Sequence, residues 1–224
     1  MLYVPKHDQV LKTILGDIFT DSNLQASLAF KGGTCLYMFY GLDRFSVDLD
    51  FNLIGDSFNH GQLDKIVSKN LSQIEKADKL NTWFWMGSYE KAFQKVKVEV
   101  SKRDYPDRYI VKDFYGLSIT IMDPSCMFAH NLCAITDRKK LQMRDIYDAH
   151  FMFDKGFDID EDIVRLRTGK TVTEYFTDLA LYIDEKVTPN NVLDGLGELL
   201  SDQQKDSVKA TLKRDILFDL RSRL

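Results

Sequence analysis

The sequence predicts an α+β protein in which a mixed sheet flanked by helices is followed by a bundle of helices. Segments in which apolar and polar residues alternate, as they do in half-buried strands, all lie before residue 123. Apolar residues at spacings of three and four, typical of amphipathic helices, occur on both sides of this point and dominate after it. We therefore expect two domains, residues 1–122 and residues 123–224.

The elements expected before the boundary follow from these two periodicities, with polar or glycine-containing stretches between them. In chain order we expect a helix over residues 6–20, a strand over 26–30, a helix over 34–40, a strand around Asp48 and Asp50, a helix over 63–74, and strands at 83–85, 95–101 and 117–122. After the boundary we expect helices beginning near Ser125 and Gln142, and further helices over 162–166, 175–183 and 208–220. Ser201 and Gln204 have the spacing of a capping box before the last helix.

The composition limits the class of protein. With 224 residues, 44% of them hydrophobic, the chain is long enough for one large or two small domains. A net charge of -4 argues against a general nucleic-acid coat, but it is compatible with a local basic groove. The three cysteines and four histidines lack metal-ligand spacing, which favours reduced thiols and structural or surface histidines. We expect a cytoplasmic protein without a membrane partner, because neither a membrane-spanning segment nor a secretory signal is evident.

The strand that carries Asp48 and Asp50 is the strongest candidate for a functional site. Side chains alternate along a strand, so both carboxylates share the face opposite Leu49. Their backbone positions lie roughly 6.6 Å apart, which lets both carboxylates reach one or two hard cations such as Mg²⁺. The preceding Gly32-Gly33 turn can bring backbone amide groups close to a phosphate.

Two neighbouring segments leave alternatives open. In the strand over residues 95–101, Lys97 and Glu99 face away from the apolar side and belong either to a functional face or to an exposed edge with an ordinary salt bridge. Trp83 and Trp85 could stack on a base, although aromatic residues in strands more often serve packing.

Residues 31–51, KGGTCLYMFYGLDRFSVDLDF, resemble the first motif of the nucleotidyltransferase superfamily, in which a glycine pair precedes a strand with two metal-binding aspartates. The Lys-Gly-Gly-Thr opening and the Arg-Phe-Ser-x-Asp-x-Asp ending resemble the AbiEii/AbiGii toxin family, including its MenT-like members. Residues 129–150, AHNLCAITDRKKLQMRDIYDAH, resemble a later motif of that family. The resemblance covers most of the chain and implies a nucleotidyltransferase-type sheet domain followed by a helical domain.

The resemblance also implies roles for individual residues. Metal ligands and catalytic residues would be Asp48, Asp50 and Glu99, with Asp145 as a further catalytic residue. Nucleotide-binding residues would be Gly32, Gly33, Thr34, Arg44, Ser46, Lys97, Arg138, Lys139 and Arg144. For Arg144 and Asp145, an ion pair between the domains is the alternative. The chain departs from the family at Asn131, where the family has a lysine, so Lys139, Lys140 or another cation takes over that charge or activity is diminished.

The function implied by the resemblance is transfer of a nucleoside monophosphate from an NTP to an acceptor hydroxyl, with Mg²⁺ in a one-ion or two-ion site. The acceptor would be RNA, with the 3′ end of tRNA as the expected position. The protein would be the toxin of a toxin–antitoxin or abortive-infection system, with a cognate antitoxin as partner. Two alternatives are the same chemistry on a small molecule or a protein, and a degenerate nucleotide-binding module without turnover.

Overall fold

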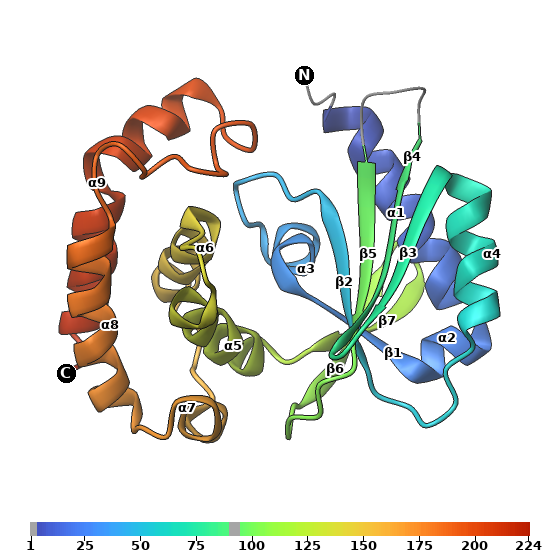
Figure 1. The fold of residues 1–224 in the computed structure, drawn as a ribbon, viewed down its shortest axis with the longest axis horizontal. Helices are drawn as coiled ribbons and strands as arrows, with labels where there is room; N and C mark the ends of the chain where they lie inside the picture. Colours follow the sequence, from blue (N-terminus) through green and yellow to red (C-terminus); the bar gives the residue numbers. More distant parts are fainter. Residues whose placement is uncertain (1–3, 90–94) are drawn as a thin grey trace. The chain divides into compact units, whose positions relative to one another are not determined.

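The computed structural model describes residues 4–89 and 95–224, which form two compact units, one up to Asp123 and one from Pro124 onward. In the described part of the chain, every strand belongs to the first unit, and the second unit is built of helices (Figure 1). The predicted α+β class, with a mixed sheet followed by helices, is confirmed.

The first unit is built on a sheet whose described strands follow the order β3-β4-β5-β2-β1-β7-β6. The strands are β1 (Leu28–Lys31), β2 (Asp48–Leu53), β3 (Ser72–Lys79), β4 (Thr82–Ser88), β5 (Lys95–Ser101), β6 (Tyr109–Phe114) and β7 (Leu117–Met122). The pairs β2–β5 and β1–β7 are parallel, whereas the other neighbours are antiparallel. The aspartate strand β2 therefore lies in the middle of a mixed sheet.

Helices cover both faces of this sheet. They are α1 (Val4–Thr20), α2 (Ser22–Ser27), α3 (Gly32–Tyr40) and α4 (His60–Asn70). Figure 1 shows α1, α2 and α4 on one side of the sheet and α3 on the other. Leu49 and Phe51 of β2 are fully buried, and the Phe51 ring centroid lies 6.3 Å from that of Phe19 on α1. The apolar face of β2 thus forms the core beneath α1 and leaves the aspartates on the opposite face.

Several boundaries differ from the expected ones. The first strand begins at Leu28 and not at residue 26, because Asp21 accepts hydrogen bonds from two first-turn amides of α2 and starts a short helix there. The helix expected to reach residue 74 ends at Asn70, and Ile74 belongs to β3. Strands β3 and β6 had no predicted counterpart. Both lie at the edges of the sheet, and their largely exposed residues lack an apolar alternation.

The position of β5 settles one alternative. This strand pairs with β4 on one side and with β2 on the other, so it is an interior strand. The interpretation of residues 95–101 as an exposed edge is therefore wrong.

The second unit packs its helices around a core of aromatic residues. The helices are α5 (Pro124–Asp137), α6 (Met143–Asp154), α7 (Glu161–Thr168), α8 (Val172–Lys186) and α9 (Asp202–Arg221). Phe153 on α6 lies 4.7 Å from Phe128 on α5 and 5.8 Å from Phe176 on α8, measured between ring centroids. The predicted capping box of Ser201 and Gln204 is present at the start of α9. Among the described residues, the helices are all too short or too polar to cross a membrane.

Candidate active site

The parallel pairing of β2 with β5 brings an acidic cluster together. In this register Asp48 lies opposite Lys97, and Asp50 lies opposite Glu99. Register partners on adjacent strands project to the same face of a sheet. Asp48, Asp50, Glu99 and Lys97 therefore share one face of the sheet, although each aspartate lies 49 positions before its register partner in the sequence.

Lys97 is in contact with two of the three carboxylates. Its Nζ lies 3.1 Å from Asp48 Oδ2 and 3.7 Å from Glu99 Oε2. Desolvation lowers the pKa of the Lys97 ammonium group, but the charges of Asp48, Asp50 and Glu99 outweigh this effect and hold the pKa above its ordinary value. Lys97 is therefore positively charged at neutral pH.

The surroundings of Asp50 disfavour the charged form of its carboxyl group. Removal of its carboxyl from water, together with the charges of Asp48 and Glu99, raises the pKa of Asp50 to about 6. Lys97 and Lys31 act in the opposite direction. Lys31 is the antiparallel register partner of Asp50 on β1. Any additional positive charge close to Asp50 would therefore stabilise its ionised form.

The turn between β1 and α3 lies directly against Asp50. Gly32 has a φ of 79°, and a Cβ atom at this position would lie 3.0 Å from Asp50 Oδ2. Both the backbone conformation and the space therefore require glycine. Gly33 belongs to the first turn of α3, and the residue before the helix is Lys31, whose side chain has no hydrogen-bond acceptor. The first amide groups of α3 can thus serve an anion.

Three of the predicted nucleotide-binding side chains lie inside the first unit. Thr34, Arg44 and Ser46 are 0%, 3% and 8% exposed. The Thr34 hydroxyl donates to the backbone carbonyl oxygen of Asp48, and its oxygen lies 2.8 Å from Ser46 Oγ. Arg44 Nη1 donates to the carbonyl oxygen of Phe45 at 3.0 Å. These contacts position the segment leading into β2, and direct contact of the three side chains with a nucleotide stays a prediction that requires them to become exposed.

His7 also positions the segment leading into β2, and nothing in the sequence indicates this role. His7 on α1 is 1% exposed, and its Nε2 lies 2.9 Å from the carbonyl oxygen of Val47. A carbonyl oxygen can only accept, so Nε2 carries the proton and donates. Tyr89 Oη lies 3.2 Å from Nδ1 on the other side of the ring. The contact joins residues 40 positions apart, which no local pattern reveals.

The remaining predicted residues belong to the second unit. Asp145, at the start of α6, is 5% exposed and accepts a hydrogen bond from Arg138 Nε at 2.5 Å. The ion pair of Asp145 therefore has its partner within the same unit. Lys139 is exposed in the connection between α5 and α6, and Arg144 is partly buried on α6. Asn131 lies on α5, and its buried Oδ1 has no hydrogen-bond partner among the described residues.

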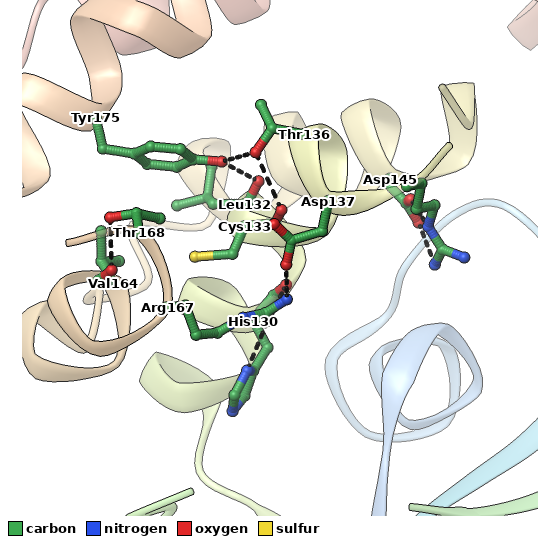
Figure 2. A network of polar contacts seen from close by, with 11 residues as sticks. His130, Leu132, Cys133, Thr136, Asp137, Asp145, Val164, Arg167, Thr168 and Tyr175 are labelled. Atoms are coloured by element: carbon green, nitrogen blue, oxygen red, sulfur yellow. Dashed lines mark hydrogen bonds and ion pairs between the residues drawn. The ribbon is translucent and has the colours of Figure 1, made fainter. Parts of the chain in front are cut away.

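A polar network holds α5 in place just before Arg138 (Figure 2). Arg167 on α7 donates to Asp137 Oδ2 at 2.5 Å, to the carbonyl oxygen of His130 at 3.0 Å, and lies 2.8 Å from His130 Nδ1. Tyr175 on α8 donates to the carbonyl oxygen of Leu132 at 2.8 Å. Helices α7 and α8 thus hold the C-terminal part of α5. Arg138, which pairs with Asp145, follows directly after this part of the helix.

The three clustered carboxylates match the ligand preference of Mg²⁺, which takes one or two carboxylates and completes its shell with water and phosphate. The carboxylates of Asp48 and Glu99 nevertheless lie against the ammonium group of Lys97. Within residues 4–89 and 95–224, no group of three or more His, Cys, Asp or Glu side chains is arranged to hold a metal ion. Asp48, Asp50 and Glu99 are of the residue types that bind a divalent cation, and their positions on β2 and β5 bring them to one face. The ammonium group of Lys97 lies between Asp48 and Glu99.

Comparisons with known proteins point to one activity. A family model described as "Nucleotidyl transferase AbiEii toxin, Type IV TA system" matches residues 13–220. No curated protein is a significant match to the sequence. Among solved structures, JHP933 from Helicobacter pylori has 22% identity and a TM-score of 0.62, covering 100% of this chain and 95% of that chain.

Two further solved structures share the fold. MenT4, a nucleotidyltransferase toxin from Mycobacterium tuberculosis, has 18% identity and a TM-score of 0.57, covering 96% of this chain and 83% of that chain. The antibiotic-resistance factor ANT(2'')-Ia has 10% identity and a TM-score of 0.51, covering 81% and 97%. Sequence identities this low support similarity of fold and no conclusion about substrate or residue roles.

Proposed function

Because the chain belongs to the AbiEii family of nucleotidyl transferase toxins, we propose that it transfers a nucleoside monophosphate from an NTP to a hydroxyl group of RNA with the help of Mg²⁺. Membership of this family means that the chain is a nucleotidyltransferase. The acceptor, the metal and the roles of individual residues are what we propose here. The observation that supports them most directly is the β2–β5 register, with Asp50 opposite Glu99 and Asp48 opposite Lys97.

In this proposal Asp48, Asp50 and Glu99 hold the divalent cation. When bound, Mg²⁺ would polarise the phosphates and lower the pKa of the attacking hydroxyl. The hydroxyl oxygen forms a bond to the α-phosphorus, and the bond between that phosphorus and the pyrophosphate breaks. The hydroxyl proton passes to Glu99, whose side chain is 30% exposed against 19% for Asp48 and is therefore easier for the acceptor to reach.

The triphosphate is held by groups around the glycine turn. The amide groups of Gly32 and Gly33 at the start of α3 and the ammonium group of Lys97 beside Asp48 suit anionic oxygens. Thr34, Arg44 and Ser46 act in this proposal by positioning β2. Arg138, Lys139, Arg144 and Asp145 keep the roles that the family resemblance implies, as cations for the nucleotide and as a catalytic carboxylate.

The biological role follows from the family. The family description names a type IV toxin–antitoxin system. We propose that this chain is the toxin of such a pair, that a cognate antitoxin counteracts it, and that the 3′ end of tRNA is the acceptor. The RNA acceptor rests on the resemblance to the family and is the part most open to direct test.

The test is transfer of radioactive label. The purified chain is incubated with Mg²⁺, total RNA and each α-³²P-labelled NTP in turn. We expect label on RNA, and we expect Asp50→Ala to lower the rate at least about a thousandfold, because it removes a ligand from the reacting centre. Asp104→Ala, in the exposed loop after β5, is the matched control and should retain full activity.

Three outcomes would contradict the proposal at different levels. Label on a small molecule or on protein, with none on RNA, would reject the RNA acceptor. Full activity of Asp50→Ala would reject the assigned site. Nucleotide binding without Mg²⁺-dependent turnover would favour a degenerate binding module.

A further inference from the structure

The side chain of Lys97 lies among the three acids in a way that the strand geometry dictates. Lys97 is the register partner of Asp48, and Glu99 is two residues further along the same strand, on the same face. The Lys97 side chain is 25% exposed, and its Nζ lies 3.1 Å from Asp48 Oδ2 and 3.7 Å from Glu99 Oε2. Two of the three proposed metal ligands therefore direct oxygen atoms toward the same ammonium group.

Lys95 shows what an ordinary lysine on this strand does. It lies on the same face of β5, two residues before Lys97, and its Nζ is 2.9 Å from Glu75 Oε1 on β3. Both side chains of that pair are more than half exposed, at 52% and 62%. Lys95 therefore makes a solvated surface pair, whereas Lys97 pairs with acids of the proposed active site.

We infer that Lys97 is an internal counter-ion that competes with the divalent cation for Asp48 and Glu99. This inference rests on the proposed function, because it takes these residues as metal ligands, and it adds how access to that site is regulated. An ammonium group and a divalent cation a few ångströms apart repel each other, and both need the same carboxylate oxygens. Metal binding therefore requires the Lys97 ammonium group to leave the carboxylates.

The exchange needs no change of the backbone. A lysine has a flexible four-carbon stem and a compact charge, so its head group can swing away while the strand stays paired. In the absence of nucleotide, the lysine offsets part of the negative charge of the cluster and weakens binding of the free metal ion. An incoming NTP brings its own oxygen ligands for the metal and anionic phosphates for the displaced ammonium group. The site is thereby set to take up its metal together with the nucleotide.

The test measures metal affinity without nucleotide, so it does not depend on catalysis. Mn²⁺ binding is followed by isothermal titration calorimetry for the wild-type chain and for Lys97→Met, which keeps the stem and removes the charge. We expect Lys97→Met to bind Mn²⁺ at least roughly tenfold more tightly. Lys95→Met, the matched control, should stay within about twofold of the wild type because its pair is exposed.

A second variant and a second measurement guard against misfolding. Lys97→Gln, a polar replacement, should behave like Lys97→Met, and circular dichroism verifies the fold of both. In the unaltered chain, saturating Mg²⁺ should raise the acetylation rate of Lys97 relative to Lys95, as read by mass spectrometry. An unchanged acetylation ratio would overturn the exchange even if neither variant folds.

The results separate this inference from the proposed function. If Asp50→Asn abolishes Mn²⁺ binding while both Lys97 variants bind no more tightly than the wild type, the counter-ion role is rejected and the metal site stands. An equal gain in Lys95→Met would also reject it, because the effect would then come from general charge. If no variant binds Mn²⁺ in an Asp50-dependent way, with or without an NTP analogue, both are rejected.

Discussion

Two buried side chains hold successive carbonyl groups at the entry to the aspartate strand. His7 donates to the carbonyl oxygen of Val47, and Thr34 donates to that of Asp48. Both side chains are at most 1% exposed, so neither carbonyl can replace its partner with bulk water. The direction in which the Asp48 carboxylate leaves the strand therefore depends on these two buried side chains.

Thr34→Val removes the hydroxyl and nearly keeps the volume. We expect a loss of about 1–3 kcal/mol in the free energy of unfolding, because a buried carbonyl loses its donor, together with a lower transfer rate. Urea denaturation measures the first and label transfer the second. Thr13→Val, which loses an exposed hydroxyl bond to the Gln9 carbonyl, is the control and should cost less than about 0.5 kcal/mol. Equal losses in the two variants would contradict the positioning role.

At the scale of elements, the turn from β1 into α3 determines how close a helix start can come to a carboxylate. Gly32 places the chain in the left-handed region while its missing Cβ makes room for Asp50. Any other residue would add backbone strain and also push against the carboxylate. Gly32 thus adopts a left-handed backbone conformation and also leaves room for Asp50. The two contributions can be separated by comparison with a glycine that only adopts the left-handed conformation.

Gly116, in the β6–β7 hairpin, is that comparison. Its φ is 85°, and a Cβ added there meets nothing within 4 Å. We expect Gly116→Ala to lower the free energy of unfolding by about 1 kcal/mol through strain alone and to leave activity intact. Gly32→Ala should cost about 1–3 kcal/mol and abolish most of the transfer. Retained activity in a folded Gly32→Ala chain would show that the close approach to Asp50 does not matter.

At the scale of the whole molecule, the chain divides into two units with separate cores. The acidic cluster belongs to the first unit, and the network around Arg167 belongs to the second. Arg167 is a suitable probe because its side chain is 9% exposed and joins α7 to the end of α5. A change there should affect the stability of the second unit alone.

We expect Arg167→Ala to cost about 2 kcal/mol, since it removes several hydrogen bonds of a nearly buried charge. Mn²⁺ affinity of the first unit should be unchanged. Arg165→Ala on the same helix, whose side chain is 59% exposed, should alter neither quantity. Denaturation and calorimetric titration measure the two effects. Lost Mn²⁺ binding in a folded Arg167→Ala chain would show that the units are coupled.

The sequence by itself determined the parts of this protein that depend on local pattern. The alternation around Asp50, the glycine pair that opens α3 and the capping box at Ser201 are all properties of a few consecutive residues, and each is found where the pattern indicated it. The family resemblance rests on the same short segments.

Only the tertiary structure decided which of these residues meet. The contact of Lys97 with Asp48, the bond from His7 to Val47 and the burial of Arg44 arise from strand register and helix packing between distant segments. Edge strands β3 and β6 form because an interior strand offers them unpaired backbone groups, whatever their own apolar pattern. Local periodicity specifies which face a side chain occupies, whereas its partner across that face depends on non-local pairing.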